Sequence, residues 1–111
     1  MAYDEELVDR VRAVLAAEPS VDERRMFGGL AFLLGGHMAV AVSGQGGLLL
    51  RVDPDEAPAL VDGHHVVPMV MRGREMAGWL RVDESAVVSE EELRRWVGHG
   101  VRYTRSLPPK G

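Results

Sequence analysis

The sequence of 111 residues contains no cysteine. Without thiols the chain has no disulfide framework, no thiol nucleophile and no thiolate metal site, and this composition fits a reducing compartment. The sequence also lacks a cationic start followed by an apolar run, and any apolar stretch of the roughly 18 to 20 residues that span a bilayer. We therefore expect a cytoplasmic protein without a membrane partner.

Positive charge is in the minority. The 13 Lys and Arg residues stand against 17 Asp and Glu residues, which gives a net charge of -4. Proteins dedicated to nucleic acid carry clustered Lys and Arg in excess, so this balance disfavours such a role. With 46% hydrophobic residues, the chain suits one compact domain over residues 1–111.

Helix signals lie near both ends of the chain. Asp4 is placed to cap a helix in which apolar residues recur at three- and four-residue spacing over 7–15, and Pro19 ends this helix. Near the other end, Ser89 and Glu92 have the spacing of a capping box and precede a second apolar stripe. We expect an N-terminal and a C-terminal helix, each with one apolar face.

Strands are predicted between these helices. A short charged strand is expected over 21–25, and the run 30–52 has the composition of three strands. Gly35-Gly36 indicates a two-residue hairpin loop inside this run, and the glycine-rich residues 44–47 indicate a longer one. A further strand is predicted over 76–82.

The two loops set the expected register of the strands. We expect Leu34 to pair with His37 across the first loop and Ser43 to pair with Leu48 across the second. One face of the sheet, the predicted core, then collects Leu30, Phe32, Leu34, Ala39, Ala41, Leu48, Leu50 and Val52. The opposite face receives Ala31, Leu33, Met38, Val40, Val42, Leu49 and Arg51.

That second face is unusually apolar for a solvated one. Two alternatives are open. In the first, a homodimer forms through an interface of Leu33, Met38, Val40, Val42 and Leu49. In the second, residues 66–71 fold over the face, because they are too apolar for a free loop and form either a packed irregular segment or an edge strand. Before them, Asp53-Pro54 predicts a short helix to about Val61.

Patterns that carry chemistry are few. The four histidines, His37, His64, His65 and His99, lack the spacing of metal ligands, so we expect no metal site. Residues 44–47 lack the lysine and Ser/Thr of a phosphate-binding loop and join two strands. We predict no catalytic residues and no cofactor.

The stretch 68–81 is the strongest candidate for a binding site. Arg72, Arg74 and Arg81 lie close in sequence to Trp79, and only Glu75 opposes them. Either Trp79 and the neighbouring methionines fill the core while the arginines surround it, or the stretch forms a cationic contact surface. The second alternative would suit a protein partner, or make the chain a small anionic-ligand or nucleotide-binding protein or an enzyme.

Three segments, 26–34, 68–82 and 107–110, together resemble the signature segments of the TfoX/Sxy N-terminal domain family, small bacterial domains linked to natural competence. The resemblance covers nearly the whole chain. It implies an α+β fold, a two-layer sandwich in which the N- and C-terminal helices pack on one face of an antiparallel sheet.

The resemblance also implies a function. It favours a non-enzymatic domain of transcription regulation that binds a protein partner, with the transcription machinery as one candidate. Longer family members attach a second, helical domain, which we expect this chain to lack. Because the domain is acidic and has no basic recognition helix, we expect no specific DNA binding by the isolated chain.

Overall fold

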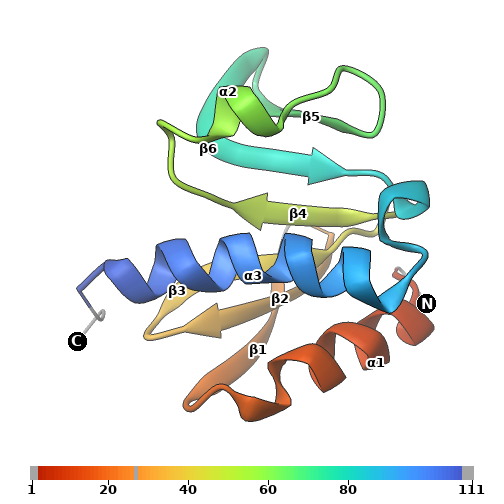
Figure 1. Ribbon diagram of the computed structural model, residues 1–111, viewed down its shortest axis with the longest axis vertical. Helices are drawn as coiled ribbons and strands as arrows, with labels where there is room; N and C mark the ends of the chain where they lie inside the picture. Colours follow the sequence, from red (N-terminus) through yellow and green to blue (C-terminus); the bar gives the residue numbers. More distant parts are fainter. Residues whose placement is uncertain (1–2, 27, 109–111) are drawn as a thin grey trace.

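The fold is a single six-stranded antiparallel sheet with helices on one face (Figure 1). The computed structural model describes residues 3–26 and 28–108, so Phe27, Pro109 and Lys110 of the signature segments lie outside it. The sheet has the order β1-β2-β3-β4-β6-β5. Its strands are β1 (Val21–Met26), β2 (Gly29–Leu34), β3 (His37–Val42), β4 (Leu48–Arg51), β5 (Val66–Met71) and β6 (Arg74–Val82). The helices are α1 (Glu5–Val14), α2 (Ala57–Leu60) and α3 (Glu90–Ser106), with 3-10 turns η1 (Leu15–Ala17) and η2 (Glu84–Val87). The predicted α+β fold is confirmed.

The local helix signals act as predicted at both ends. The Asp4 carboxylate accepts hydrogen bonds from the backbone N–H groups of Glu6 and Leu7 at the start of α1. Ser89 and Glu92 bond reciprocally at the start of α3, which forms the predicted capping box. The helix predicted over 53–61 is shorter than expected, because residues 53–56 form a turn and only α2 is helical.

The main core lies between the sheet and the helices α1 and α3. Helix α1 and the turn after it contribute Leu7, Val8, Val11 and Leu15, and α3 contributes Leu93, Trp96 and Val97. The central strands present Phe32, Val40, Val42, Leu48, Leu50, Leu80 and Val82 to them. Every one of these side chains is at least nine-tenths buried, so this layer is the hydrophobic interior of the protein.

The register of β3 differs from the prediction. Leu34 pairs with His37 as expected, but a shift between Phe32 and Leu33 leaves Ala39 as a bulge, and Phe32 pairs with Val40. A bulge adds one residue to one strand and so turns all following side chains to the other face. The predicted pairing of Ser43 with Leu48 is also wrong by one residue: Leu48 pairs with Val42.

These two corrections exchange the faces of three side chains. Val40 and Val42, predicted for the interface, belong to the main core, while Ala41, predicted for the core, lies on the opposite face. Leu33, Met38 and Leu49 are on that opposite face as predicted. All three are buried within one copy of the chain, at 5%, 4% and 1% exposure.

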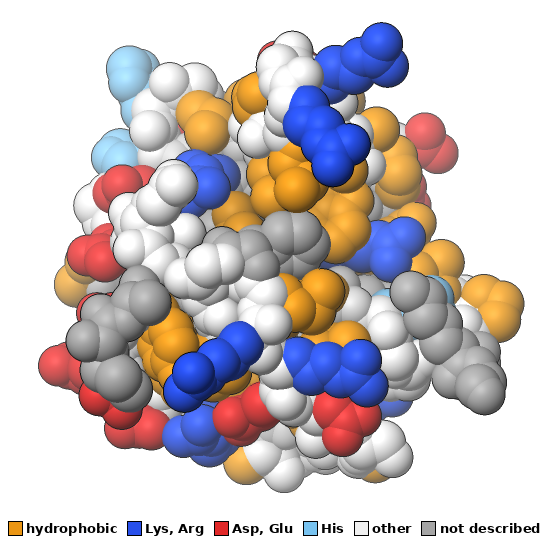
Figure 2. Space-filling model, turned by 180° about the vertical axis from the view of Figure 1, so that it is seen from behind, with side chains coloured by type: hydrophobic (Ala, Val, Ile, Leu, Met, Phe, Trp, Pro, Cys, Tyr) orange, Lys and Arg blue, Asp and Glu red, His pale blue; other side chains and the backbone are white. Residues whose placement is uncertain are grey.

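The second face of the sheet therefore has a small core of its own. It consists of Ala31, Leu33, Met38, Ala41, Leu49 and Met69, with Met26 and Trp79 packed against it. Met69 comes from β5, the edge strand formed by residues 66–71, which agrees with the second of the two alternatives for this face. Figure 2 shows this side of the molecule, where hydrophobic side chains are interspersed with those of Lys and Arg.

Ala41 provides a test of this second core. It is fully buried and pairs with Ala31 on one side and Leu49 on the other. We expect Ala41→Leu to overpack the cluster and lower the free energy of unfolding by about 1 to 3 kcal/mol, measured by urea denaturation. An unchanged midpoint would mean that this face is open at Ala41.

Both edges of the sheet are protected against pairing with another strand. Edge strand β1 presents Asp22, Glu23, Arg24 and Arg25 to solvent. In β5, the N–H of Val66 donates to the Asp62 carboxylate, and its C=O accepts from the N–H groups of Asp62 and Gly63. Pro68 has no N–H to offer. Charge, a backbone turn and proline thus limit strand addition at the two edges.

Candidate functional site

The predicted site residues divide between the two ends of the β5–β6 hairpin. Arg72 and Arg74 lie at its exposed tip, where Arg72 and Gly73 both have positive φ (53° and 76°), the geometry of a two-residue type I′ loop. Arg81 lies seven residues further along β6, which at about 3.3 Å per residue separates it from Arg74 by roughly 20 Å. The structure does not bring the three arginines together.

Arg81 lines a separate, small cavity of about 210 Å³. Its other lining residues are Gln45, Gly46, His64, His65, Val67 and Asp83. The Arg81 guanidinium donates to the Ser43 hydroxyl at 3.2 Å. Hydrogen bonds from Ser85 lower the pKa of Asp83, which keeps a negative charge in the cavity. An anionic ligand would meet this carboxylate beside Arg81, so the geometry does not favour the anion-binding alternative.

Asp62 borders the same region and has a structural role. Its carboxylate accepts hydrogen bonds from the backbone N–H groups of His64, His65 and Val66 at 2.8, 2.8 and 2.9 Å. These bonds, led by that from Val66, lower the pKa of Asp62 from its usual 3.8 to about 2. The carboxylate holds the turn that precedes β5.

This pKa makes the fold sensitive to acid. Because the folded-state pKa of Asp62 lies below its unfolded value, the stabilisation is complete above about pH 4 and is lost as the pH falls toward 2. We expect Asp62→Asn to unfold at lower urea than the wild type at pH 7, and the difference to narrow progressively below pH 4. A difference that stays constant from pH 7 to pH 2 would contradict this role.

Trp79 lies at the middle of β6, half-buried, against the second core. The cation on its ring is not one of the predicted arginines but Arg51, whose guanidinium carbon is 5.4 Å from the ring centroid of Trp79 and 5.7 Å from that of Tyr103. Arg51 ends β4 directly opposite Trp79. This contact could be predicted only if the pairing of β4 with β6 were known.

Trp79 also lines the largest of the clefts described here, with a volume of about 450 Å³. The cleft lies between α2 with its flanking residues and strands β5 and β6. Its lining residues are Pro54, Ala57, Pro58, Val61, Pro68, Glu75, Met76, Ala77, Gly78, Trp79 and Leu80. The volume falls within the range of about 300 to 1,000 Å³ typical of binding pockets. Because Pro54, Pro58, Glu75 and Ala77 are exposed, the cleft is open to solvent along one side.

A kink in β6 shapes this cleft. Gly78 has φ of +79°, and its C=O accepts a hydrogen bond from the N–H of Val52. A Cβ atom at this position would lie 2.8 Å from the Val52 oxygen and 3.0 Å from the Pro54 ring. Because glycine has no Cβ atom, the residues that precede α2 can approach β6 closely at this point. A glycine inside a predicted strand is the sequence signal for such a feature.

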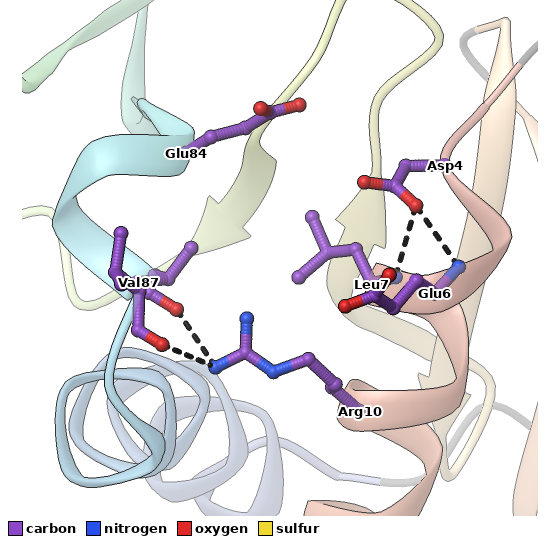
Figure 3. Close-up of a pocket in the computed structure, with 7 residues that line it drawn as sticks. Asp4, Glu6, Leu7, Arg10, Glu84 and Val87 are labelled. Carbon is purple, nitrogen blue, oxygen red and sulfur yellow. Dashed lines mark hydrogen bonds between the residues drawn. The ribbon is translucent and has the colours of Figure 1, made fainter.

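A second, polar cavity of about 260 Å³ lies between α1 and η2 (Figure 3). The Arg10 guanidinium donates to the C=O groups of Val87 and Val88 at 2.9 and 3.1 Å, and Asp4 caps α1. Glu6 and Glu84 also line the cavity. Arg10 and Asp4 are thus occupied in holding α1 and the segment before α3 in place, and the cavity has a structural explanation.

No metal site is evident in the described residues. Across 3–26 and 28–108, no group of three or more His, Asp or Glu side chains is placed to hold a metal ion. His64 and His65 lie in the turn before β5, far in sequence from His37 and His99. In the same residues, no helix has both the length and the apolar character needed to cross a membrane.

Comparison with known proteins adds the family. Searches of the curated proteins and of the solved structures found no match. The model of the TfoX N-terminal domain matches residues 13–103, a stretch that runs from the end of α1 through the whole sheet and most of α3. The match contains both strands of the hairpin and the cleft described above. The chain therefore belongs to the TfoX N-terminal domain family.

Proposed function

We propose that this protein is a non-enzymatic regulatory domain that acts in the bacterial cytoplasm by binding another protein. Membership of the TfoX N-terminal domain family supports a place in competence or transcription regulation. The transcription machinery is one candidate source of the partner, and a second copy of the chain is another. The proposal needs a contact surface, and the buried second face of the sheet is not available as one in a folded copy.

The observation that carries the proposal is the open apolar cleft beside the β5–β6 hairpin. It exposes Ala77 and Pro58 together with the half-buried Trp79. Next to it, β5 exposes Val70 by 59%, which is a large value for an aliphatic strand residue. Apolar side chains beside a hollow are typical of surfaces that receive a protein partner.

Site-specific cross-linking in the native cells tests the proposal. A photoreactive amino acid replaces Ala77, which lines the cleft, and in a control it replaces Ala13, an exposed residue of α1. We expect a discrete protein adduct from position 77 and not from position 13. An adduct of twice the chain mass would identify a second copy as the partner. No adduct, or the same adducts from both positions, would contradict the proposal.

The proposed role does not require direct contact with DNA. Because the net charge is -4 and the two cationic ends of β6 are far apart, we expect no sequence-selective binding to duplex DNA at near-physiological salt. Any residual contact would come from Arg72 and Arg74 at the hairpin tip and would weaken steeply as salt rises. Fluorescence anisotropy with duplexes of different sequence measures this. Sub-micromolar, sequence-selective binding would make the domain a DNA reader and contradict the expectation.

A further inference from the structure

The pairing of β6 is irregular where the strand lines the cleft. Leu80 pairs with Pro68 of β5 and Glu75 pairs with Val70, so the register skips the intervening residues of β6. Strand β4 pairs with β6 only from Trp79 onward. Met76 and Ala77 therefore have no paired residue in the register with either neighbouring strand, whereas the Gly78 C=O accepts a hydrogen bond from the N–H of Val52, directly after β4. Such a segment offers main-chain hydrogen bonds to an extended peptide laid beside it.

The walls of the cleft suit one large apolar side chain. Pro54 and Pro58 form the side next to α2, Pro68 lies on β5, and Trp79 lies on β6. Proline rings have almost no side-chain freedom to lose, so a side chain that inserts between them orders little of the protein. The open rim leaves a small molecule exposed on one side, whereas a peptide anchored by one residue can continue past it.

Charge at the cleft has one sign. Glu75 is the only charged residue among those that line it in the described part of the chain. Val70 and Glu75 are direct cross-strand partners and so share a face of the hairpin, the face on which Glu75 lines the cleft. Met71 and Arg74 form the next pair and lie on the other face. The rim therefore combines an exposed valine with a carboxylate.

From these features we propose that the cleft binds an extended segment of the partner protein in which a large apolar residue is adjacent to a lysine or arginine. The apolar side chain enters between the prolines and Trp79, the backbone of the segment bonds to Met76 and Ala77, and the basic side chain pairs with Glu75. This inference rests on the proposed function, because it specifies the segment that the protein partner must present.

Three short, end-blocked peptides with glycine and serine flanks serve as probes. They carry leucine–arginine, leucine–glutamate or serine–arginine at the centre, and each is titrated at millimolar concentration into the isotope-labelled chain. We expect saturable NMR shifts at the amides of Ala77 and Gly78 and at the Trp79 indole. The leucine–arginine peptide should bind about two- to tenfold more tightly than the leucine–glutamate peptide, in line with one exposed ion pair. It should also bind more tightly than the serine–arginine peptide.

Charge reversal makes the test specific. Glu75→Lys should reverse the preference between the two leucine peptides, whereas Glu91→Lys, the same change on the exposed surface of α3, should leave it unchanged. Equal binding of the peptides, shifts elsewhere, or a preference that Glu75→Lys does not alter would overturn the inference. A specific cross-link from position 77 without this charge preference would leave the proposed function standing. Peptide selectivity without any cross-link would instead count against the proposed function.

Discussion

Gly100→Ala is expected to destabilise the protein by about 2 kcal/mol or more, although alanine is the better helix former. A Cβ atom at this position of α3 would lie 2.5 Å from the carbonyl oxygen of Ala39 and 3.2 Å from its carbonyl carbon. Both are backbone atoms of the bulge in β3, so they cannot move aside as a flexible side chain would. The helix would have to lift from the centre of the sheet.

Gly98 in the same helix provides the matched control. It is exposed, and an added Cβ atom would meet nothing within 4 Å. Gly98→Ala should therefore stabilise the protein by about 0.5 to 1 kcal/mol through helix propensity alone. Urea denaturation should show that the free energy of unfolding falls in Gly100→Ala and rises in Gly98→Ala, although the two positions are only two residues apart. Stabilisation by both substitutions would mean that α3 does not contact β3 at Ala39.

Val40→Lys is expected to abolish the folded state. Val40 is fully buried in the main core, where it pairs with Phe32 on one side and Leu50 on the other. Burial of an unpaired ammonium group costs several kcal/mol, which is comparable to the whole stability of a domain, about 5 to 15 kcal/mol. Circular dichroism and light scattering should report an unfolded or aggregated chain.

Val70→Lys is the control for this substitution. Val70 is also a strand valine, but it is 59% exposed at the end of β5, so the lysine would stay in water. We expect its stability to remain within about 0.5 kcal/mol of the wild type. A Val40→Lys variant as stable as Val70→Lys would mean that Val40 is not buried inside the fold.

These variants also show which parts of the fold are predictable from sequence. The Asp4 cap, the Ser89 and Glu92 capping box and the Gly35-Gly36 loop were predicted because each is a local arrangement of a few residues. The bulge at Ala39 was not predicted. Strand parity is normally revealed by alternation of apolar and polar residues, and β3 is apolar on both faces. Nothing in the local pattern distinguishes Val40 from Ala41.

The candidate site was less predictable than the fold. Arginines within ten residues of one another suggested one cationic surface, but an extended strand carries Arg74 and Arg81 to opposite ends of the hairpin. The cleft depends on the approach of α2 to β6 at Gly78, two segments about 20 residues apart. Gly78 within a predicted strand was a signal of irregularity, yet the residues that it would bring together, such as Pro54 and Ala77, follow only from tertiary structure.

The protected edge of β5 has a consequence for how the protein behaves in acid. The Asp62 carboxylate holds the turn that occupies the backbone of Val66, and it remains ionised down to about pH 2. Once it is protonated, the turn is weakened and the apolar edge 66–71 becomes available to other molecules while much of the sheet is still formed. Acid exposure should therefore cause molecules to associate through intermolecular β-structure rather than to unfold reversibly. Storage or refolding near neutral pH should avoid this association.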